Sequence, residues 1–147
     1  MNTPVDDMER LSQRHFQIVI RLQKVRAQVQ DLRRASMLRE IAANEELLAA
    51  IQGLASAARQ GGLVGLTLVA NVLGERVESL ARRGRIPDNV LALVTDWSAR
   101  AELYVRRPRF AEFARSLVRQ LQDPAWELPL APAEGDRLIS ALLDPCL

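Results

Sequence analysis

The clearest pattern in the chain is a stripe of positions that recur at alternating steps of three and four residues from Met8 to Leu32. All of them are apolar except His15, and such a stripe is typical of a helix that packs lengthwise against another helix. Phe16, Val19 and Ile20 lie beside the stripe and widen it, which predicts contact with an intrachain core and with an outside partner together. The expected interaction positions are Met8, Leu11, His15, Phe16, Ile18, Val19, Leu22, Val25, Val29 and Leu32.

The first helix is predicted to be long, because neither glycine nor proline occurs between Pro4 and Gly53. Thr3 suits the N-cap and Pro4 the first helical position, so the helix is expected to begin there. It is expected to end between residues 34 and 36, since the apolar positions then resume in a different phase, with a stutter in one longer helix as the alternative.

The second helix is predicted from about Ser36 to Arg59, and Gly61 with Gly62 ends it. A fresh helix start at Asn44 is the alternative. The apolar positions that resume out of phase at its start are Met37, Leu38 and Ile41. Its apolar side is expected to hold Ile41, Leu48, Ile51, Ala55 and Ala58.

Three further segments have helical periodicity. The third helix, from about Leu63 to Arg83, has a second stripe that could pack on the first helix, and Gly84 supplies a left-handed C-cap. The fourth follows Pro87 and the fifth follows Pro108. The third helix has Leu63, Leu66, Ala70, Leu73, Val77 and Leu80, the fourth has Val90, Val94, Trp97, Ala101 and Tyr104, and the fifth has Phe110, Phe113, Leu117 and Leu121.

The C-terminal part differs from the rest, which divides the chain into a bundle domain over 1–123 and a tail over 124–147. An extended arm with Pro129 and Pro132 is expected from Trp126 to Gly135, followed by a short amphipathic helix from Asp136 to Leu143. The tail is expected to pack on its own bundle, with docking on a partner as the alternative. Its docking residues are Trp126, Leu138, Ile139, Leu142 and Leu143.

These elements predict an all-α fold, an up-and-down antiparallel bundle of four to five helices with a long N-terminal heptad helix and a proline-containing tail that ends in a short helix. The 147 residues are enough for one core, and their composition, 48% hydrophobic and 4% aromatic, suits helices. A net charge of +2 is too balanced to indicate nucleic-acid binding by itself.

Compartment follows from cysteine usage and from the N-terminus. Cys146 is the only cysteine, so neither an intrachain disulfide nor a cysteine-based zinc site is possible, and a cytoplasmic setting is expected. The acidic N-terminal residues do not suit a signal peptide. The longest uncharged stretch, Gln60 to Gly74, is too short and polar to span a bilayer, so no membrane contact is expected.

The residue types that support catalysis are sparse. A single histidine excludes a paired-histidine metal motif, and the carboxylates are scattered as neighbours of arginines. The glycines between 53 and 74 do not follow a strand, so they form no phosphate loop. The sequence therefore predicts no catalytic, cofactor or metal site and no small-molecule substrate, and the protein is not expected to be an enzyme.

One segment resembles a known family. Residues 52–62, continued by the ladder Leu66, Ala70 and Leu73, resemble the centre of histidine phosphotransfer (HPt) domains, including the first domain of chemotaxis kinases. In that family a histidine is followed by a lysine three residues later, a glycine four later, a small residue six later and a turn glycine ten later. Ala58 and Gly62 match the last two positions, and the resemblance covers about 40 of the 147 residues.

The functional positions of the family are the ones that differ. Gln52 stands where the phosphoacceptor histidine would be, Ala55 replaces the lysine, and Ser56 replaces the glycine that leaves room for a docking receiver domain. A glutamine amide has no ring nitrogen that could attack a phosphoaspartate. The resemblance therefore implies a degenerate module that binds without relaying phosphate.

Two further features each have two interpretations. His15 is expected to be a packing residue, with a phosphoacceptor or a pH-sensitive contact across a parallel dimer as the alternative. The arginines at predicted helix ends are expected to offset the negative ends of helix dipoles, with nucleic-acid contact as the alternative. An up-and-down order places five of them at one basic pole, namely Arg33, Arg34, Arg82, Arg83 and Arg85.

The sequence thus predicts a non-enzymatic regulatory or adaptor protein that acts by protein–protein binding, as a homodimer and without a cofactor. Its most concrete version is the degenerate phosphotransfer module engaging a receiver or kinase. The alternatives are a small DNA-associated regulator that uses the basic pole, and a secretion-type chaperone.

Overall fold

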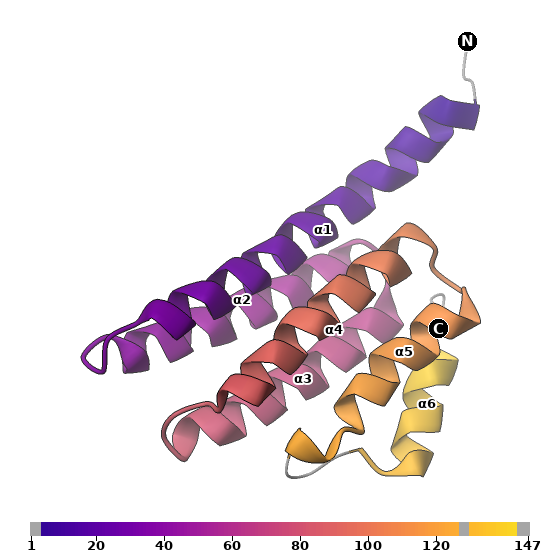
Figure 1. The fold of residues 1–147 in the computed structure, drawn as a ribbon. Coiled ribbons are helices and arrows are strands. Elements are labelled where there is room, and N and C mark those ends of the chain that lie inside the picture. Colours follow the sequence, from indigo (N-terminus) through magenta and orange to yellow (C-terminus); the bar gives the residue numbers. More distant parts are fainter. Residues whose placement is uncertain (1–3, 127–129, 144–147) are drawn as a thin grey trace.

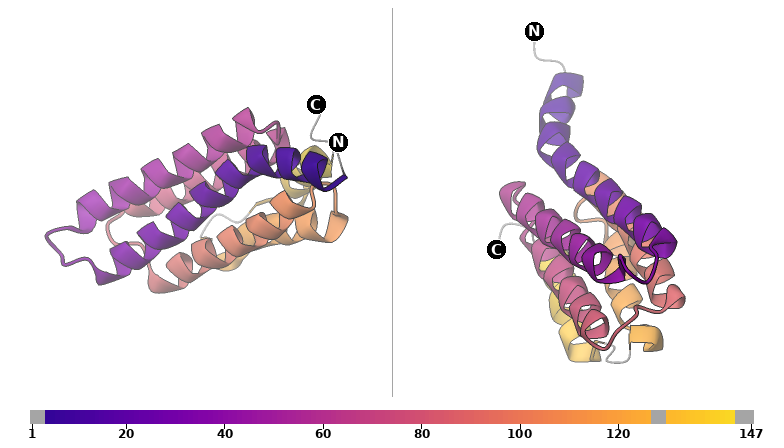
Figure 2. Two further views of the ribbon diagram at one scale, coloured as in Figure 1. Left: turned by 90° about the horizontal axis from the view of Figure 1, so that it is seen from above. Right: turned by 90° about the vertical axis from the view of Figure 1, so that its left-hand side faces the viewer.

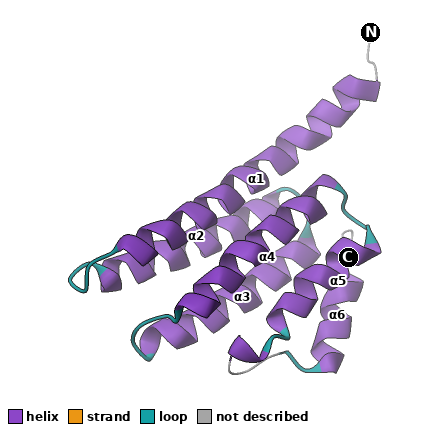
Figure 3. Cartoon of the chain, in the orientation of Figure 1, coloured by secondary structure: helices purple, strands orange, loops and turns teal. Residues whose placement is uncertain are grey.

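The computed structural model describes residues 4–126 and 130–143 of the chain, and every regular element in them is helical. The fold is all-α, as Figure 3 shows. The elements are α1 (Pro4–Arg34), α2 (Glu40–Gln60), α3 (Val64–Arg82), α4 (Asp88–Arg106), α5 (Ala111–Leu121), the 3-10 turn η1 (Pro124–Trp126) and α6 (Pro132–Leu143).

The helices form three layers of two, with α1 and α2 on one side, α3 and α4 in the middle, and α5 and α6 on the other (Figure 1). The first four helices alternate in direction, as short connections require. α1 packs mainly against α2 and α4, so its principal partners differ from the α3 stripe expected from the sequence. A heptad stripe indicates that a helix packs on another helix, but it does not indicate which one, because stripes on different helices have the same spacing.

The core is built from the apolar faces of these helices. All stripe positions expected on α3, from Leu63 to Leu80, are buried, which confirms that prediction. The face expected on α4, from Val90 to Tyr104, is buried throughout as well. On α5, Leu117 and Leu121 are buried, whereas Phe110 and Phe113 are half-buried and meet edge to face with ring centroids 4.7 Å apart.

The start of α2 differs from the expectation. α2 begins at Glu40 and not at Ser36, and it runs without interruption through Asn44. A turn held by a 2.9 Å hydrogen bond from the Arg39 amide to the Ser36 carbonyl stands in place of the expected first helical turn. Ile41 is 75% exposed, so its expected place on the core side is wrong. The residues that α2 buries are Ala43, Asn44, Leu47, Ala50, Ile51, Leu54, Ala55 and Ala58.

Glycines stop two helices where the sequence predicts. α2 ends at Gln60 and the next residues include Gly62 with φ +81°, while α3 ends at Arg82 shortly before Gly84 with φ +125°. Residues with a side chain are strained at these angles, so glycine lets the chain reverse there. Thr3, the expected N-cap of α1, lies outside the described residues.

The structure leaves less room for an extended arm before the last helix than the sequence predicts. Residues 124–126 form a 3-10 turn and α6 begins at Pro132, four residues before the expected start at Asp136. Proline suits the first turn of a helix because its missing amide hydrogen has no intrahelical acceptor there. Pro129 and Cys146 lie outside the described residues.

Candidate interaction surfaces

The stripe on α1 faces the protein's own core along most of its length. His15 and Val19 are half-buried at the edge of this face. The side chains of Met8 and Leu11 lie outside the described part of the chain. The stripe positions with at most 7% of their surface exposed are Ile18, Leu22, Val25, Val29 and Leu32.

A second apolar strip on α1 faces solvent. Phe16 is 57% exposed and Ile20 is 39% exposed, one helical turn apart on the side away from the core. Figures 1 and 2 show that the N-terminal part of α1 continues beyond the bundle. This surface, Phe16 with Ile20, is the α1 ridge. It agrees with the width of the sequence stripe, which predicts more than one apolar face.

Polar contacts hold the middle of α1 on α4. The Ser98 hydroxyl donates to the Leu22 carbonyl over 3.1 Å, and the Arg26 guanidinium bonds the Glu102 carboxylate at 2.8 Å. Burial raises the pKa of Glu102, but hydrogen bonds and charge from Arg26 and Arg106 outweigh it and lower that pKa below its ordinary value. The carboxylate therefore stays ionised, and α1 is anchored to α4 in the same region that presents the ridge.

Gln52 lies on the exposed side of α2, at a groove between α2 and α3. The groove encloses about 260 Å³ and has an apolar floor that includes Ile51 and Ala70. Gln52, Asn71, Glu75 and Glu78 line it as well, so its lining is partly polar and acidic. Ser56, one turn after Gln52, is exposed, but Ala55 is buried against the core.

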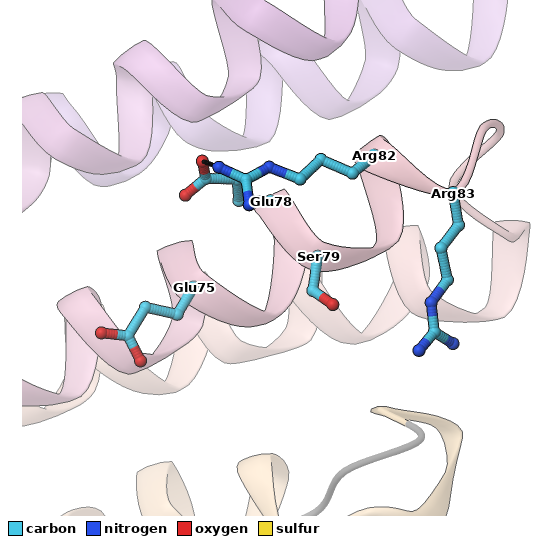
Figure 4. Close-up of a pocket in the computed structure, with 5 residues that line it drawn as sticks. All are labelled: Glu75, Glu78, Ser79, Arg82 and Arg83. Atoms are coloured by element: carbon cyan, nitrogen blue, oxygen red, sulfur yellow. Dashed lines mark hydrogen bonds and ion pairs between the residues drawn. The ribbon is translucent and has the colours of Figure 1, made fainter.

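An open hollow of about 430 Å³ adjoins this groove at the end of α3 (Figure 4). Its lining is mixed in charge, because Glu75 and Glu78 share it with Arg82 and Arg83. The Glu78 carboxylate accepts a hydrogen bond from Arg82 at 2.7 Å, so part of that charge is paired within one helix. The hollow contains no histidine or cysteine, and its lining matches no catalytic arrangement considered above.

The five arginines of the basic pole come from the end of α1, the end of α3 and the connection that follows α3, and all are exposed. Arg33 and Arg85 line one small pocket at the same end of the bundle, as the antiparallel order predicts. Glu40 and Asp88 line that pocket too, and Glu40 pairs with Arg85 at 3.4 Å. The basic pole is therefore interleaved with carboxylates.

The turn between α1 and α2 carries a surface that the sequence analysis missed. Met37 is 89% exposed, Leu38 is 97% exposed and Ile41 is 75% exposed, the three highest values among the large apolar side chains described. These three residues form the apolar tip. The sequence signal for this surface was the change in phase of the apolar positions after Leu32. That change fits a turn with exposed apolar residues as well as it fits the start of a new helix.

The tail packs on its own bundle, in line with the favoured expectation. Trp126 is buried, and its indole donates a 2.9 Å hydrogen bond to the Gln120 carbonyl. Leu142 is fully buried, whereas Leu138, Ile139 and Leu143 are partly buried against the core. α6 lies against α3 and α5, so these side chains are occupied within the chain.

No family model, curated protein or solved structure matches the chain. Among the described residues, no group of three or more histidine, cysteine, aspartate or glutamate side chains is placed to hold a metal ion. No helix in the same residues is long and apolar enough to cross a membrane. The features that remain to indicate a function are the surfaces described above.

Proposed function

We propose that this protein is a non-enzymatic adaptor or regulator that acts by helix-mediated binding, with α1 as its docking helix and a second copy of the chain as its partner. The exposure of Phe16 and Ile20 carries the proposal. Exposed apolar side chains that are neighbours on a helix form a surface whose burial against a second helix is favourable. The middle of α1 is already fixed to α4, so docking need not order that part of the helix first.

The charge distribution along α1 favours an antiparallel pair. Asp6, Asp7 and Glu9 outnumber Arg10 and Arg14 and leave the segment before Phe16 slightly acidic, whereas Arg21 and Lys24 add positive charge one turn or more beyond it. Two α1 helices that cross antiparallel at Phe16 bring the acidic end of each opposite the basic segment of the other. A parallel pair aligns like charges instead. The proposed assembly is therefore an antiparallel homodimer through the α1 ridge.

The experiment is a mass measurement by light scattering on the purified chain and on Phe16→Glu/Ile20→Glu. We expect the parent chain to have twice the 16.4 kDa mass of one chain, and the variant to have the single mass. Burying four added carboxylates at a two-fold interface is strongly unfavourable. Raised salt should weaken the parent dimer, because the paired charges at its edges are exposed to solvent.

Val64 and Leu68 provide a matched control. They are also one turn apart and exposed, by 38% and 44%, but they lie on α3. Val64→Glu/Leu68→Glu should keep the doubled mass. A parent chain that stays monomeric, or a Phe16→Glu/Ile20→Glu variant that stays dimeric, contradicts the proposal.

A second candidate function is the degenerate phosphotransfer module, in which the α2–α3 groove binds a receiver or kinase domain. The exposure of Gln52 midway along α2 favours it, because a docking domain could reach that position. The burial of Ala55 counts against it, since the position that holds a lysine in that family faces the core. The test is titration with receiver and kinase domains from the same genome, comparing the parent chain with Gln52→Trp/Ser56→Trp. If the parent chain and the Gln52→Trp/Ser56→Trp variant bind these domains equally well, the groove is rejected as the binding site.

The other two expectations receive no specific support. Carboxylates within the basic pole weaken the case for a DNA-associated regulator, because they reduce its attraction for phosphates. The secretion-type chaperone stays a prediction from the sequence.

A further inference from the structure

The apolar tip lies at the end of the α1–α2 hairpin, beyond the connection between α3 and α4 (Figures 1 and 2). Two local backbone hydrogen bonds shape the connection between α1 and α2, from the Ala35 amide to the Leu32 carbonyl at 3.2 Å and from the Arg39 amide to the Ser36 carbonyl at 2.9 Å. Met37 and Leu38 are almost wholly exposed, so they add little burial to the fold. Polar residues would close this turn equally well, so its apolar side chains gain free energy only when something else covers them.

Arginines surround the tip. Arg33 and Arg34 end α1, Arg39 immediately precedes α2, and all three are exposed. Arg85 joins them from the connection after α3, where it lines a pocket with Arg33. The other two arginines of the basic pole, Arg82 and Arg83, are exposed at the end of α3.

Carboxylates at this end offset part of that charge. Glu40 pairs with Arg85, Glu78 pairs with Arg82, and Asp88 lines the pocket with Arg33. Arg34 precedes the tip and Arg39 lies between Leu38 and Ile41, and within residues 4–126 and 130–143 neither forms an ion pair with these carboxylates. The surface around the apolar tip therefore remains net basic.

We propose that the apolar tip inserts into the surface of a membrane that contains anionic lipid. A convex turn with aliphatic side chains at its end enters the boundary between headgroups and acyl chains, and the surrounding guanidinium groups meet lipid phosphates. The expectation of no membrane contact rests on the lack of a segment that could span a bilayer, and insertion of a tip requires no such segment.

The side-chain chemistry favours lipid over the other acidic partners. Single-stranded nucleic acid is held by stacking on aromatic side chains, and the tip has none. A helix-binding protein groove takes an amphipathic helix face, whereas Met37 and Leu38 lie in a turn. Lipid makes no demand on side-chain register, and it accepts aliphatic groups at the end of a hairpin.

The test is flotation of the purified full chain with two kinds of vesicle. One kind is pure phosphatidylcholine, and the other is roughly two parts phosphatidylcholine to one part phosphatidylglycerol. We expect binding to the anionic vesicles at low salt and at least about tenfold weaker binding to the neutral ones. Met37→Ser/Leu38→Ser should weaken binding to anionic vesicles by about tenfold or more, since it removes the inserted groups.

Two controls keep this test specific. Val64→Ser/Leu68→Ser removes exposed apolar groups from α3, and Arg115→Gln/Arg119→Gln removes exposed charge from α5, so both should bind like the parent chain. Arg34→Gln/Arg39→Gln should weaken binding and reduce its dependence on salt. Helix content by circular dichroism checks folding, which the exposed tip substitutions should leave unchanged.

Three results would overturn the proposal. They are a parent chain that does not float with anionic vesicles, a Met37→Ser/Leu38→Ser variant that floats as well as the parent chain, and Met37- and Leu38-dependent binding to duplex DNA in place of vesicles. A failed dimer measurement leaves this test intact, because the α1 ridge lies on α1, whereas the apolar tip lies in the following turn and at the start of α2.

Discussion

The hydroxyl of Tyr104 on α4 donates a 2.5 Å hydrogen bond to the carbonyl oxygen of Leu142 on α6. Both residues are fully buried, and the bond joins positions 38 residues apart. The Leu142 carbonyl is in the last turn of α6, where no intrahelical amide can bond it. The tyrosine therefore caps the helix end from the bundle core and fixes the tail against its own chain.

Tyr104→Phe should destabilise the protein while leaving its fold intact. The ring still fills the core, but the Leu142 carbonyl loses its partner inside the protein, which typically costs about 1–3 kcal/mol. Urea unfolding measures the loss, and hydrogen exchange over residues 136–143 should rise with it. An unchanged midpoint contradicts a stabilising role for this bond.

The same tyrosine predicts a loss of stability in strong alkali. Burial raises the pKa of Tyr104 to about 12, even though the charge of Arg109 acts to lower it, whereas the ordinary value is 10.0. Because this pKa is raised, the folded state keeps the proton of the Tyr104 hydroxyl at pH values at which the unfolded state has already lost it. The stabilising contribution is therefore full below pH 10.0 and disappears as the pH rises toward about 12. The difference in unfolding free energy between the parent chain and Tyr104→Phe should narrow over that interval.

Gly65→Ala should separate α3 from α6. A methyl group at Gly65 would lie 2.5 Å from the backbone of Ala141, and backbone atoms cannot rotate away as a side-chain end can. We expect a loss of about 1–3 kcal/mol, as for overpacked cores, measured by urea unfolding. Gly74→Ala is the control, because its new methyl group meets only an Ile51 side-chain atom at 3.4 Å and alanine favours the helix. A control that is as unstable as Gly65→Ala contradicts this explanation.

Arg26 and Glu102 should show a measurable coupling energy. Their side chains are only 28% and 18% exposed, so the pair is less screened than one at the surface. A double-mutant cycle with Arg26→Gln and Glu102→Gln should give a coupling of about 0.5–1.5 kcal/mol. The lowered pKa of Glu102 means that this stabilisation is present above the ordinary value of 4.5 and is lost as the pH falls toward the folded value. A cycle whose coupling is zero at pH 7 rejects the pair as an anchor of α1.

Regular stripes made most of this fold predictable. The buried faces of α3 and α4 follow strict helical spacing, and glycines with positive φ stop α2 and α3 where the sequence places them. The partners of α1 could not be predicted, because packing of α1 on α2 and α4 depends on the arrangement of all six helices. The predicted starts of α2 and α6 were each wrong by four residues. In the sequence, a turn without glycine looks like part of a helix, and a proline that begins a helix looks like part of an extended arm.

The candidate surfaces were predictable to different degrees. The width of the α1 stripe predicts the exposure of Phe16 directly, because one face of a helix cannot bury all of those residues. Met37, Leu38 and Ile41 were placed with the second helix, and apolar residues in a predicted helix are normally assigned to its core. Leu38 is in a turn and not in a helix, and only this placement shows that nothing within the described chain covers it.

The two proposed surfaces together predict that the protein clusters vesicles. In an antiparallel pair of α1 helices the two apolar tips point in opposite directions, so one flat membrane cannot receive both. The dimer should therefore connect two anionic vesicles, which dynamic light scattering detects as a rise in apparent size. Phe16→Glu/Ile20→Glu should bind vesicles and leave their size unchanged, whereas Met37→Ser/Leu38→Ser should do neither. Binding by a dimeric parent chain without clustering contradicts the antiparallel arrangement, since a parallel pair places both tips on the same membrane.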